Sequence, residues 1–229
     1  MYTPPMFKPD RAASLAFAEA RGFAMACAWD GQRPVASPLP FYLEYAGDGT
    51  PVALFHVARH NPLVKLADGT TPWVLAVTGA DAYVTPDWYV SADQVPTWLY
   101  QAVHLTGPVR TLSDEELAVQ VDALSAKFEN RLAPKKPWTS GKMTPARFEA
   151  LRKAIVGLSM QVEDVEGSFK LNQHKSGADY AAVANGLAAM SDAGSQTIAQ
   201  LMREARPQAF AATTQETDSN KSATLEGSM

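Results

Sequence analysis

The sequence contains little of what marks secreted or membrane-bound proteins. Cys27 is the only cysteine among 229 residues, so no internal disulfide can form. It lies in the apolar run FAMACAW and is expected to be a small buried side chain, which is consistent with a cytoplasmic protein. No apolar run approaches the length of a membrane span, and the N-terminus lacks the basic-then-apolar pattern of a signal peptide. We therefore expect a soluble, cytoplasmic protein without membrane contact.

Basic charge is also scarce. The chain has 20 lysines and arginines against 24 aspartates and glutamates, a net charge of −4, and no dense basic cluster. An acidic chain without a recognisable helix-turn-helix is a poor reader of duplex DNA. Direct DNA binding is therefore doubtful, and regulation through a partner or a small molecule fits the charge better.

Signatures of nucleotide, metal and nucleophile chemistry are missing as well. There is no G-x-G-x-x-G after a first strand and no phosphate-loop signature, so a nucleotide, if bound, is not held in those ways. The four histidines, at positions 56, 60, 104 and 174, have no cysteine nearby and no H-E-x-x-H frame, so no metal site is expected. Gly157-Leu158-Ser159 lacks the second glycine of a nucleophile elbow. No catalytic residue is identified from these patterns.

The order of the predicted elements favours an α+β fold with an antiparallel sheet. Asp30-Gly31 supplies the positive φ of a tight hairpin. Six or seven strands in close succession, then helices, then a strand pair, indicate an antiparallel barrel with flanking helices and not a parallel doubly wound sheet. Turns are predicted at 79–81 and at Gly167. Strands are predicted at residues 23–29, 34–45, 51–58, 73–79, 82–89, 98–112, 155–167 and 168–177.

Helix signals are local and clear. Asp10 and Gly22 are typical of the start and end of a helix, and Ser113 with Glu116 forms a capping box. From Pro207 the composition offers little to bury, and a disordered tail is expected. We divide the chain into a main domain of residues 1–190 and a segment of residues 191–229 with a short helix and this tail. Further helices are predicted to start at Thr144-Pro145 and to span residues 178–190 and 197–205.

Two features are candidates for a ligand site. The stretch 83–107 is rich in aromatic rings, which suit either a core or a planar ligand, and residue type alone favours a core. In the segment HVARHNP, Arg59 and Asn61 at a strand end can hold a phosphate, or can be a surface arginine in a capped turn. Lys170 is similarly a phosphate partner or a solvated strand lysine. Aromatic walls with cations are compatible with a planar anionic cofactor.

Taken together and in order, several segments resemble the PaiB-like family of FMN-binding negative transcriptional regulators. This resemblance covers roughly residues 1 to 190. It implies an FMN-binding split β-barrel, similar to the pyridoxamine-phosphate-oxidase-like flavoproteins, that works as a homodimer with flavin near the subunit interface. The segments are MYTPPMF, HVARHNP, DAYVTPDWY, VPTWLYQAVHLTG, AIVGLSMQVEDVEGSFKLNQ and the alanine-rich end.

The resemblance also implies roles for particular residues. His56, Arg59 and Asn61 would hold the FMN phosphate and ribityl chain. Four further residues would lie around the isoalloxazine or the dimer seam, and two would close the site. The four residues around the isoalloxazine or the dimer seam are Tyr83, Trp88, Thr97 and Trp98, and the two that would close the site are Lys170 and Gln173.

The chain departs from the family pattern at characteristic positions. Met6 replaces a histidine, Pro38 stands in a usual S-H-L-P, and Leu99 replaces an asparagine, while the late K-L-S-Q-N reads Lys170 to His174 as KLNQH. Three functions remain open on these residues. They are a flavin-binding regulator, an FMN-dependent oxidoreductase in which His104 or His174 would donate a proton, and a flavin-free relative that binds another ligand.

Overall fold

The computed structural model describes residues 1–211, which form two compact units. The barrel unit contains residues 10–78 and 102–167 together with Met1. The C-terminal unit contains residues 2–9 and 79–101 and the described residues from 168 onward. Each unit therefore combines segments that are far apart in the sequence.

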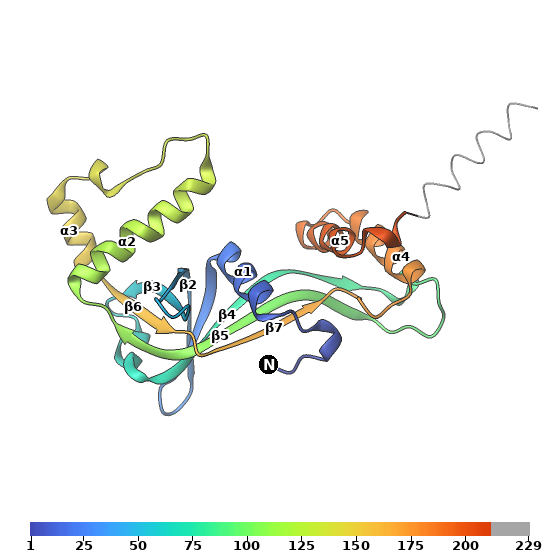
Figure 1. Cartoon of the computed structure of the whole chain (residues 1–229), viewed down its shortest axis with the longest axis horizontal. Coiled ribbons are helices and arrows are strands. Elements are labelled where there is room, and N and C mark those ends of the chain that lie inside the picture. Colours follow the sequence, from blue (N-terminus) through green and yellow to red (C-terminus); the bar gives the residue numbers. More distant parts are fainter. Residues whose placement is uncertain (212–229) are drawn as a thin grey trace, which may run out of the picture. The chain divides into compact units, whose positions relative to one another are not determined.

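The strands form one seven-stranded sheet, in the order β4-β1-β2-β3-β6-β5-β7 (Figure 1). β4 also pairs with β5, so the six strands from β4 to β5 in this order close into a barrel. Every strand pair with a described register is antiparallel, which confirms the predicted α+β class. The strands are β1 (Phe23–Trp29), β2 (Pro34–Tyr45), β3 (Pro51–Ala58), β4 (Asp68–Val84), β5 (Thr97–Thr111), β6 (Ile155–Gln161) and β7 (Asp164–Lys170).

Residues 1–211 contain five α-helices, and the helix ends follow the local signals in the sequence. The Asp10 side chain accepts a hydrogen bond from the Ala13 amide, and Gly22 ends the first helix with a left-handed φ of 59°. Both hydrogen bonds of the capping box between Ser113 and Glu116 are present. The helices are α1 (Arg11–Arg21), α2 (Asp114–Glu129), α3 (Pro145–Lys153), α4 (Gly177–Ala188) and α5 (Ala193–Ala205).

The two faces of β1 differ sharply in burial. Its alanines at 24, 26 and 28 point into the barrel core and are nearly inaccessible, whereas Phe23, Met25 and Trp29 are 49%, 41% and 56% exposed. Cys27 lies on the same outward face and is half-buried, so the expectation that it is buried in the core was wrong. The alternation of side chains along a strand accounts for this, because the alanines occupy every second position.

Two turns differ from the sequence prediction. The turn expected at 79–81 does not exist, because β4 runs unbroken through these residues and pairs with both β1 and β5. The turn expected at Gly167 lies instead at 162–163, between β6 and β7. Glycine needs no turn when its φ is negative, and the left-handed glycines of the chain do not include Gly79 or Gly167.

Gly107 lies inside β5, which confirms that it does not end the strand. A Cβ on this residue would lie 1.8 Å from the backbone oxygen of Gln161. The close approach of two backbones, and not a special dihedral angle, therefore requires glycine here.

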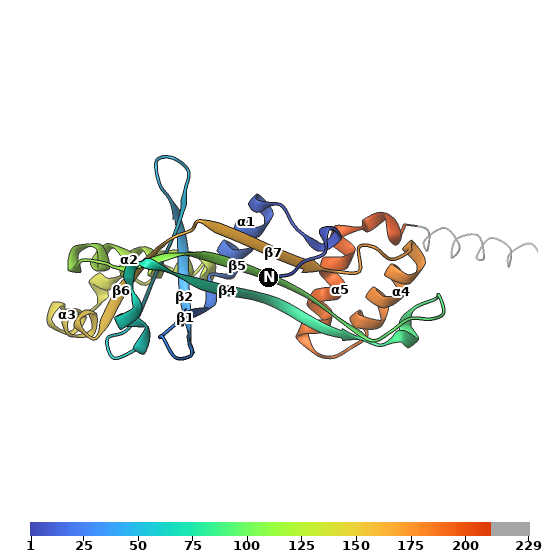
Figure 2. The same cartoon turned by 90° about the horizontal axis from the view of Figure 1, so that it is seen from below.

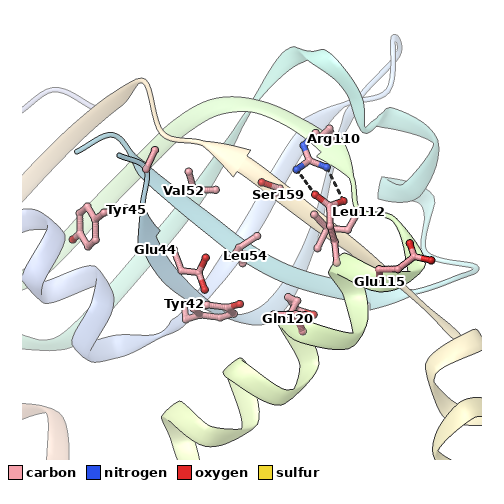
Figure 3. A pocket seen from close by; sticks show the side chains of 13 residues that line it. Tyr42, Glu44, Tyr45, Val52, Leu54, Arg110, Leu112, Glu115, Gln120 and Ser159 are labelled. Carbon is pink, nitrogen blue, oxygen red and sulfur yellow. Dashed lines mark hydrogen bonds and ion pairs between the residues drawn. The ribbon is translucent and has the colours of Figure 1, made fainter. Parts of the chain in front are cut away.

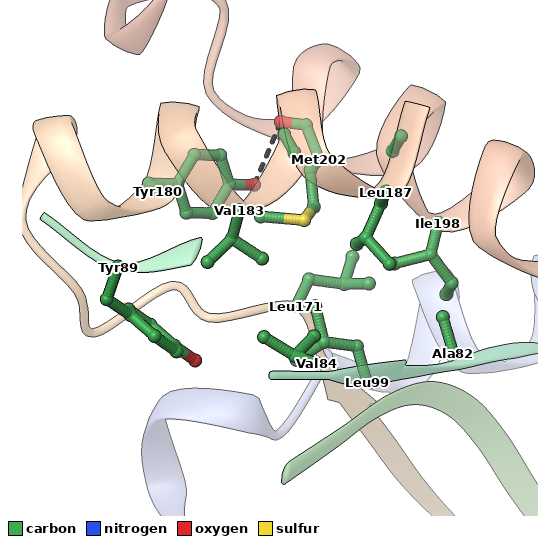
Figure 4. Packing of buried hydrophobic residues seen from close by; sticks show 12 residues of the cluster. Ala82, Val84, Tyr89, Leu99, Leu171, Tyr180, Val183, Leu187, Ile198 and Met202 are labelled. Atoms are coloured by element: carbon green, nitrogen blue, oxygen red, sulfur yellow. Dashed lines mark hydrogen bonds between the residues drawn. The ribbon is translucent and has the colours of Figure 1, made fainter. Parts of the chain in front are cut away.

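The C-terminal unit has its own apolar core, drawn in Figure 4. Helices α4 and α5 lie side by side in Figures 1 and 2 and contact each other along this core. Leu99, Val183 and Leu187 have no exposed surface, and the Tyr180 hydroxyl donates a hydrogen bond of 2.8 Å to the Met202 carbonyl. Leu99, one of the departures from the family pattern, is therefore a core residue in this chain.

The expected disordered tail was to begin at Pro207. Pro207–Ala209 instead forms a 3-10 helix, and the Phe210 ring meets the Tyr180 ring edge to face. The rest of that prediction, residues 212–229, lies outside the described residues. Within residues 1–211, no helix is both long enough and apolar enough to cross a membrane, and no cluster of metal-ligating side chains occurs.

Candidate flavin site

The barrel unit presents a polar cluster where β3 ends, which we call the Arg59 cluster and which consists of Arg59, Asn61 and Ser37. The Asn61 carboxamide oxygen accepts a hydrogen bond of 3.0 Å from the Leu63 amide and so caps the following turn. Its nitrogen donates to the Ser37 hydroxyl over 2.7 Å. Because Ser37 accepts this bond, its own proton remains available for a ligand.

The Arg59 guanidinium is fixed by the start of β6. Its Nε donates to the Lys153 carbonyl over 2.6 Å and its Nη2 to the Ile155 carbonyl over 2.9 Å. Nη1 has no partner among the described residues, and the side chain is exposed. The cluster therefore offers a positioned cation and a free hydroxyl, the donor types that bind a phosphate.

His56 has a different environment. Its side chain lies beside Gln120 of α2, and its Nδ1 is buried without a hydrogen-bond partner. Burial lowers the pKa of His56, and the neighbouring Gln120 offsets this only in part. The ring is therefore mainly neutral at pH 7, which does not suit it to neutralise a phosphate.

In the C-terminal unit the predicted aromatic residues do come together. The rings of Tyr83 and Trp98 meet edge to face with centroids 6.0 Å apart, and both side chains are about half exposed. Together with Trp88 they line a cavity of about 530 Å³. Gly186 allows this placement of Trp88, since a Cβ there would lie 2.6 Å from the indole. The cavity has the flat apolar walls that bind planar rings.

Lys170 and Thr97 are also neighbours, joined by a hydrogen bond of 2.6 Å from Nζ to the threonine hydroxyl. They line a second cavity of about 330 Å³, which we call the basic pocket. His174 and Lys175 belong to the same lining, and so does Met6, the residue that replaces the family histidine. Desolvation, then the two lysines, lower the pKa of His174.

Gln173 serves its own loop. Its carboxamide oxygen accepts a hydrogen bond of 2.8 Å from the Leu171 amide, and its nitrogen donates to the Phe169 carbonyl. Of the nine predicted residues, three lie in the barrel unit and six in the C-terminal unit. In the C-terminal unit the structure joins Lys170 with Thr97 and brings the three aromatic rings to one cavity. In the barrel unit Asn61 contacts Ser37, whereas the Arg59 side chain contacts the carbonyls of Lys153 and Ile155.

The closed antiparallel barrel with flanking helices defines a split β-barrel protein. Residues 1–164 match the family model described as "Putative FMN-binding domain". The chain belongs to this family of FMN-binding domains, which confirms the family that the sequence resembles and the cofactor, FMN, that the resemblance implies.

Individual relatives support the assignment. The chain is 29% identical over 205 residues to the "Protease synthase and sporulation protein PAI 2" of Bacillus subtilis, covering 89% of this chain and 97% of the relative. An uncharacterized protein of Emericella nidulans is 27% identical over 135 residues, covering 53% of this chain and 54% of that protein. In fold, the chain resembles the FAD and heme binding protein of Mycobacterium smegmatis, with a TM-score of 0.50 and 17% identity over 70% of this chain and 71% of that one.

The donor set of the Arg59 cluster fits the phosphate of FMN. It combines a guanidinium with one unused nitrogen and a hydroxyl whose proton is free. The aromatic cavity fits a planar ring by its walls, although Asp81 and Asp192 add acidic groups to its lining. His56 does not fit the phosphate, because it is buried and neutral.

Proposed function

We propose that the chain binds FMN through its phosphate at the Arg59 cluster. The observations that carry this proposal are the fixed Arg59 guanidinium and the Asn61–Ser37 hydrogen bond at the end of β3, in a chain of the FMN-binding family. Arg59 would neutralise the phosphate, and Ser37 would donate a hydrogen bond to it. Bound FMN would supply electron-transfer chemistry, whereas the protein would hold and orient it.

We also propose that the aromatic residues Tyr83, Trp88 and Trp98, with Thr97, lie around the flavin ring or the dimer seam. Lys170 and Gln173 would close the site. Their support is the shared cavity of the three rings and the short hydrogen bond between Lys170 and Thr97. We leave His56 out of this proposal because of its burial.

The test compares FMN with riboflavin, which lacks the phosphate. Arg59→Ala is expected to weaken FMN binding by about 10- to 100-fold, since a hydrogen bond to a charged group contributes roughly 1.5–3 kcal/mol. Riboflavin affinity is expected to change little. Arg33→Ala is the matched control, because Arg33 is an exposed arginine whose nearest acidic partner is Asp30. Flavin fluorescence quenching measures both affinities.

Equal losses for FMN and riboflavin would contradict a phosphate role and point to damage of the fold. Arg59→Lys distinguishes a phosphate role from damage to the fold, because it keeps the positive charge but loses the paired N–H donors of the guanidinium. The FMN affinity of this variant is expected to lie between those of the wild type and Arg59→Ala, and its riboflavin affinity is expected to stay unchanged.

We infer that two copies of the chain associate through the outward face of β1 and β2. Phe23, Met25 and Trp29 form an exposed row on this face. In the β1–β2 register they lie opposite Pro40, Pro38 and Pro34, and no charged residue interrupts the set. An uncharged apolar face of this kind on a sheet is typical of a protein interface, and a twofold dimer is the commonest arrangement.

Trp29→Glu is expected to convert the dimer to a monomer in light scattering coupled to size exclusion. Leu132→Glu is the control, because Leu132 is 53% exposed in the same unit but lies away from this face, after α2. A wild-type monomer at micromolar concentration, or a dimer that survives Trp29→Glu, would overturn the inference.

We propose that this cytoplasmic flavin-binding dimer has a regulatory role. The support is the Bacillus subtilis relative, whose name describes a protease synthase and sporulation protein. The net charge of −4 argues against direct reading of DNA, so the role would depend on a partner or a small molecule. A gel-shift assay at physiological salt that shows specific DNA binding by the protein alone would contradict this form of the proposal.

An FMN-dependent oxidoreductase is the second candidate, and the basic pocket favours it. Lys170 and Lys175 give this pocket a positive lining, and His174 beside them is a proton donor candidate. A small anionic substrate would fit this set of groups. Reductase activity of the FMN-loaded protein that falls in His174→Gln, with flavin affinity unchanged, is the expected sign of this function.

A further inference from the structure

A cavity of about 490 Å³ lies in the barrel unit, between the sheet and the first half of α2 (Figure 3). Its lining comes from β2, β3, β5, β6 and α2, and includes none of the nine residues predicted to bind flavin. Its volume is in the range of pockets that bind small organic molecules. We call it the Gln120 pocket.

Gln120 is the unusual residue of this lining. Its side chain is 1% exposed, yet neither its amide nitrogen nor its amide oxygen has a hydrogen-bond partner. Gln120 lies close enough to His56 to affect the pKa of that ring, but the two side chains do not form a hydrogen bond of normal geometry. A buried amide without partners is costly, and a native protein keeps one where a ligand or water completes it.

The neutral His56 ring can accept only one N–H of this amide. The Gln120 oxygen then remains as an acceptor in the pocket wall, beside Tyr42 (Figure 3). The Tyr42 hydroxyl lies near the Glu44 carboxylate, and burial, then this carboxylate, raises the pKa of Tyr42. This part of the pocket therefore offers acceptors to a ligand and no free cation.

The charged lining is acidic. Arg110 is the only cation among the lining residues, and it is held by Glu116 through two hydrogen bonds of 3.0 and 2.8 Å. Neither Glu44 nor Glu115 forms an ion pair among the described residues, although Arg152 lies close enough to Glu115 to help lower its pKa. A positively charged ligand would therefore be favoured over an anion of the same size.

The remaining walls are apolar. They include Val52 and Leu54 of β3, together with Leu112 and Val119. They provide a surface for a hydrocarbon body of a few carbons or one ring, but they cannot satisfy a second charged group.

We propose that the Gln120 pocket binds a small organic cation, a primary ammonium on an apolar body. The ammonium donates to Glu44 and to the Gln120 oxygen, and the hydrocarbon contacts Leu54 and Leu112. None of these groups is among the residues proposed to hold FMN, so this site does not depend on the flavin proposal.

The test uses three probes of nearly equal size and different charge. They are 2-phenylethylamine, which is a cation at pH 7, 2-phenylethanol, which is neutral, and 3-phenylpropionate, which is an anion. Isothermal titration of the full chain at low salt is expected to show binding of the amine. The alcohol is expected to bind at least about tenfold more weakly, and the anion not measurably.

Gln120→Leu separates a ligand role from a packing role. The substitution replaces an unpartnered buried amide by an apolar group of similar volume, so thermal stability is expected to hold or rise. Affinity for 2-phenylethylamine is expected to fall about five- to tenfold because an acceptor is lost. Glu44→Gln is expected to weaken binding of the amine and to leave binding of the alcohol unchanged. The control Glu163→Gln, outside the pocket, is expected to change neither affinity.

Three results would overturn the proposal. The first is equal binding of all three probes, which would make the pocket a nonspecific apolar surface. The second is unchanged amine affinity in both Gln120→Leu and Glu44→Gln. The third is the absence of binding by the amine to the folded wild-type protein at millimolar concentration. If Gln120→Leu does not fold, Glu44→Gln decides alone, because Glu44 is exposed.

Discussion

Asp179 is the residue whose replacement tests the packing of the C-terminal unit most sharply. Its carboxylate is 4% exposed and lies in the first turn of α4. One oxygen accepts hydrogen bonds of 2.9 Å from the amides of Val90 and Ser91. The other accepts from the hydroxyls of Ser91 and Ser176, over 2.8 and 3.0 Å. The carboxylate therefore fixes the loop that connects Trp88 with β5.

Asp179→Ala is expected to destabilise the protein by roughly 3–5 kcal/mol, because it leaves buried donors without an acceptor. Asp192→Ala is the matched control. Asp192 also caps a helix in this unit, but its carboxylate is exposed, and losing such a cap costs about 1 kcal/mol. The difference between the two variants measures what the loop contacts add.

The pH dependence follows from the pKa of Asp179. Hydrogen bonds from the Ser91 amide and hydroxyl, then from Ser176 and Val90, lower it from 3.8 to about 2. The charged form is thus favoured in the folded state, and the contribution is complete above about pH 4. It is lost as the pH falls toward 2. This lowering of the pKa contributes about 2 kcal/mol to the free energy of unfolding at pH 7, and roughly half of that contribution is lost at pH 3.

Chemical denaturation at pH 7 and pH 3, followed by tryptophan fluorescence, measures these effects. The advantage of the wild type over Asp179→Asn is expected to be about 2 kcal/mol at pH 7 and to shrink at pH 3. Amide exchange at Val90 and Ser91 is expected to accelerate in the variant. A constant difference across this pH range, or a cost of Asp179→Ala no larger than that of Asp192→Ala, would refute the reasoning.

Three further predictions concern packing and burial. Gly107→Ala is expected to destabilise the protein by at least about 3 kcal/mol, because the new Cβ would overlap a backbone oxygen, and the melting temperature should drop accordingly. The control Gly47→Ala places its Cβ in open space and is expected to change the stability by less than about 0.5 kcal/mol. Leu187→Ala is expected to cost about 2–5 kcal/mol in urea unfolding, and a cost below 1 kcal/mol would contradict its place in the core. His56 is buried and its pKa is lowered, so as the pH falls below about 6.5 the unfolded chain takes up a proton more readily than the folded one and the free energy of unfolding decreases. His56→Leu is expected to flatten this dependence of stability on pH between pH 7.5 and 5.5. An unchanged dependence would contradict the burial of His56.

The parts of the fold that depend on local chemistry were predictable from the sequence. The Asp10 cap, the Gly22 stop and the Ser113–Glu116 capping box all form as expected. Each of these signals acts within a few residues, so no knowledge of distant partners is needed.

The errors arose where a distant partner decides the outcome. Residues 79–81 resemble a turn, but β4 continues through them as one strand that pairs with β1 at residues 74–76 and also with β5. Likewise, nothing near Asp179 in the sequence indicates its partners Val90 and Ser91, which are almost 90 residues away. Long-range pairing of this kind cannot be read from a local pattern.

The candidate site was predictable in part. The aromatic residues around Tyr83 and the polar end of β3 were recognised from residue type and family resemblance. Gln120 was missed, although a signal existed, since it lies between Leu117 and Leu124 at helical spacing on the buried stripe of α2. A polar residue at such a position indicates a buried contact or a ligand.

Equilibrium dialysis of the purified chain against FMN, followed by an absorbance scan after desalting, tests the central claim most directly. We predict retained flavin approaching one FMN per chain, with retention markedly reduced in Arg59→Ala and preserved in Arg33→Ala. A folded protein that retains no flavin, or an Arg59→Ala variant that retains as much as the wild type, would contradict the assignment of the Arg59 cluster as the phosphate site.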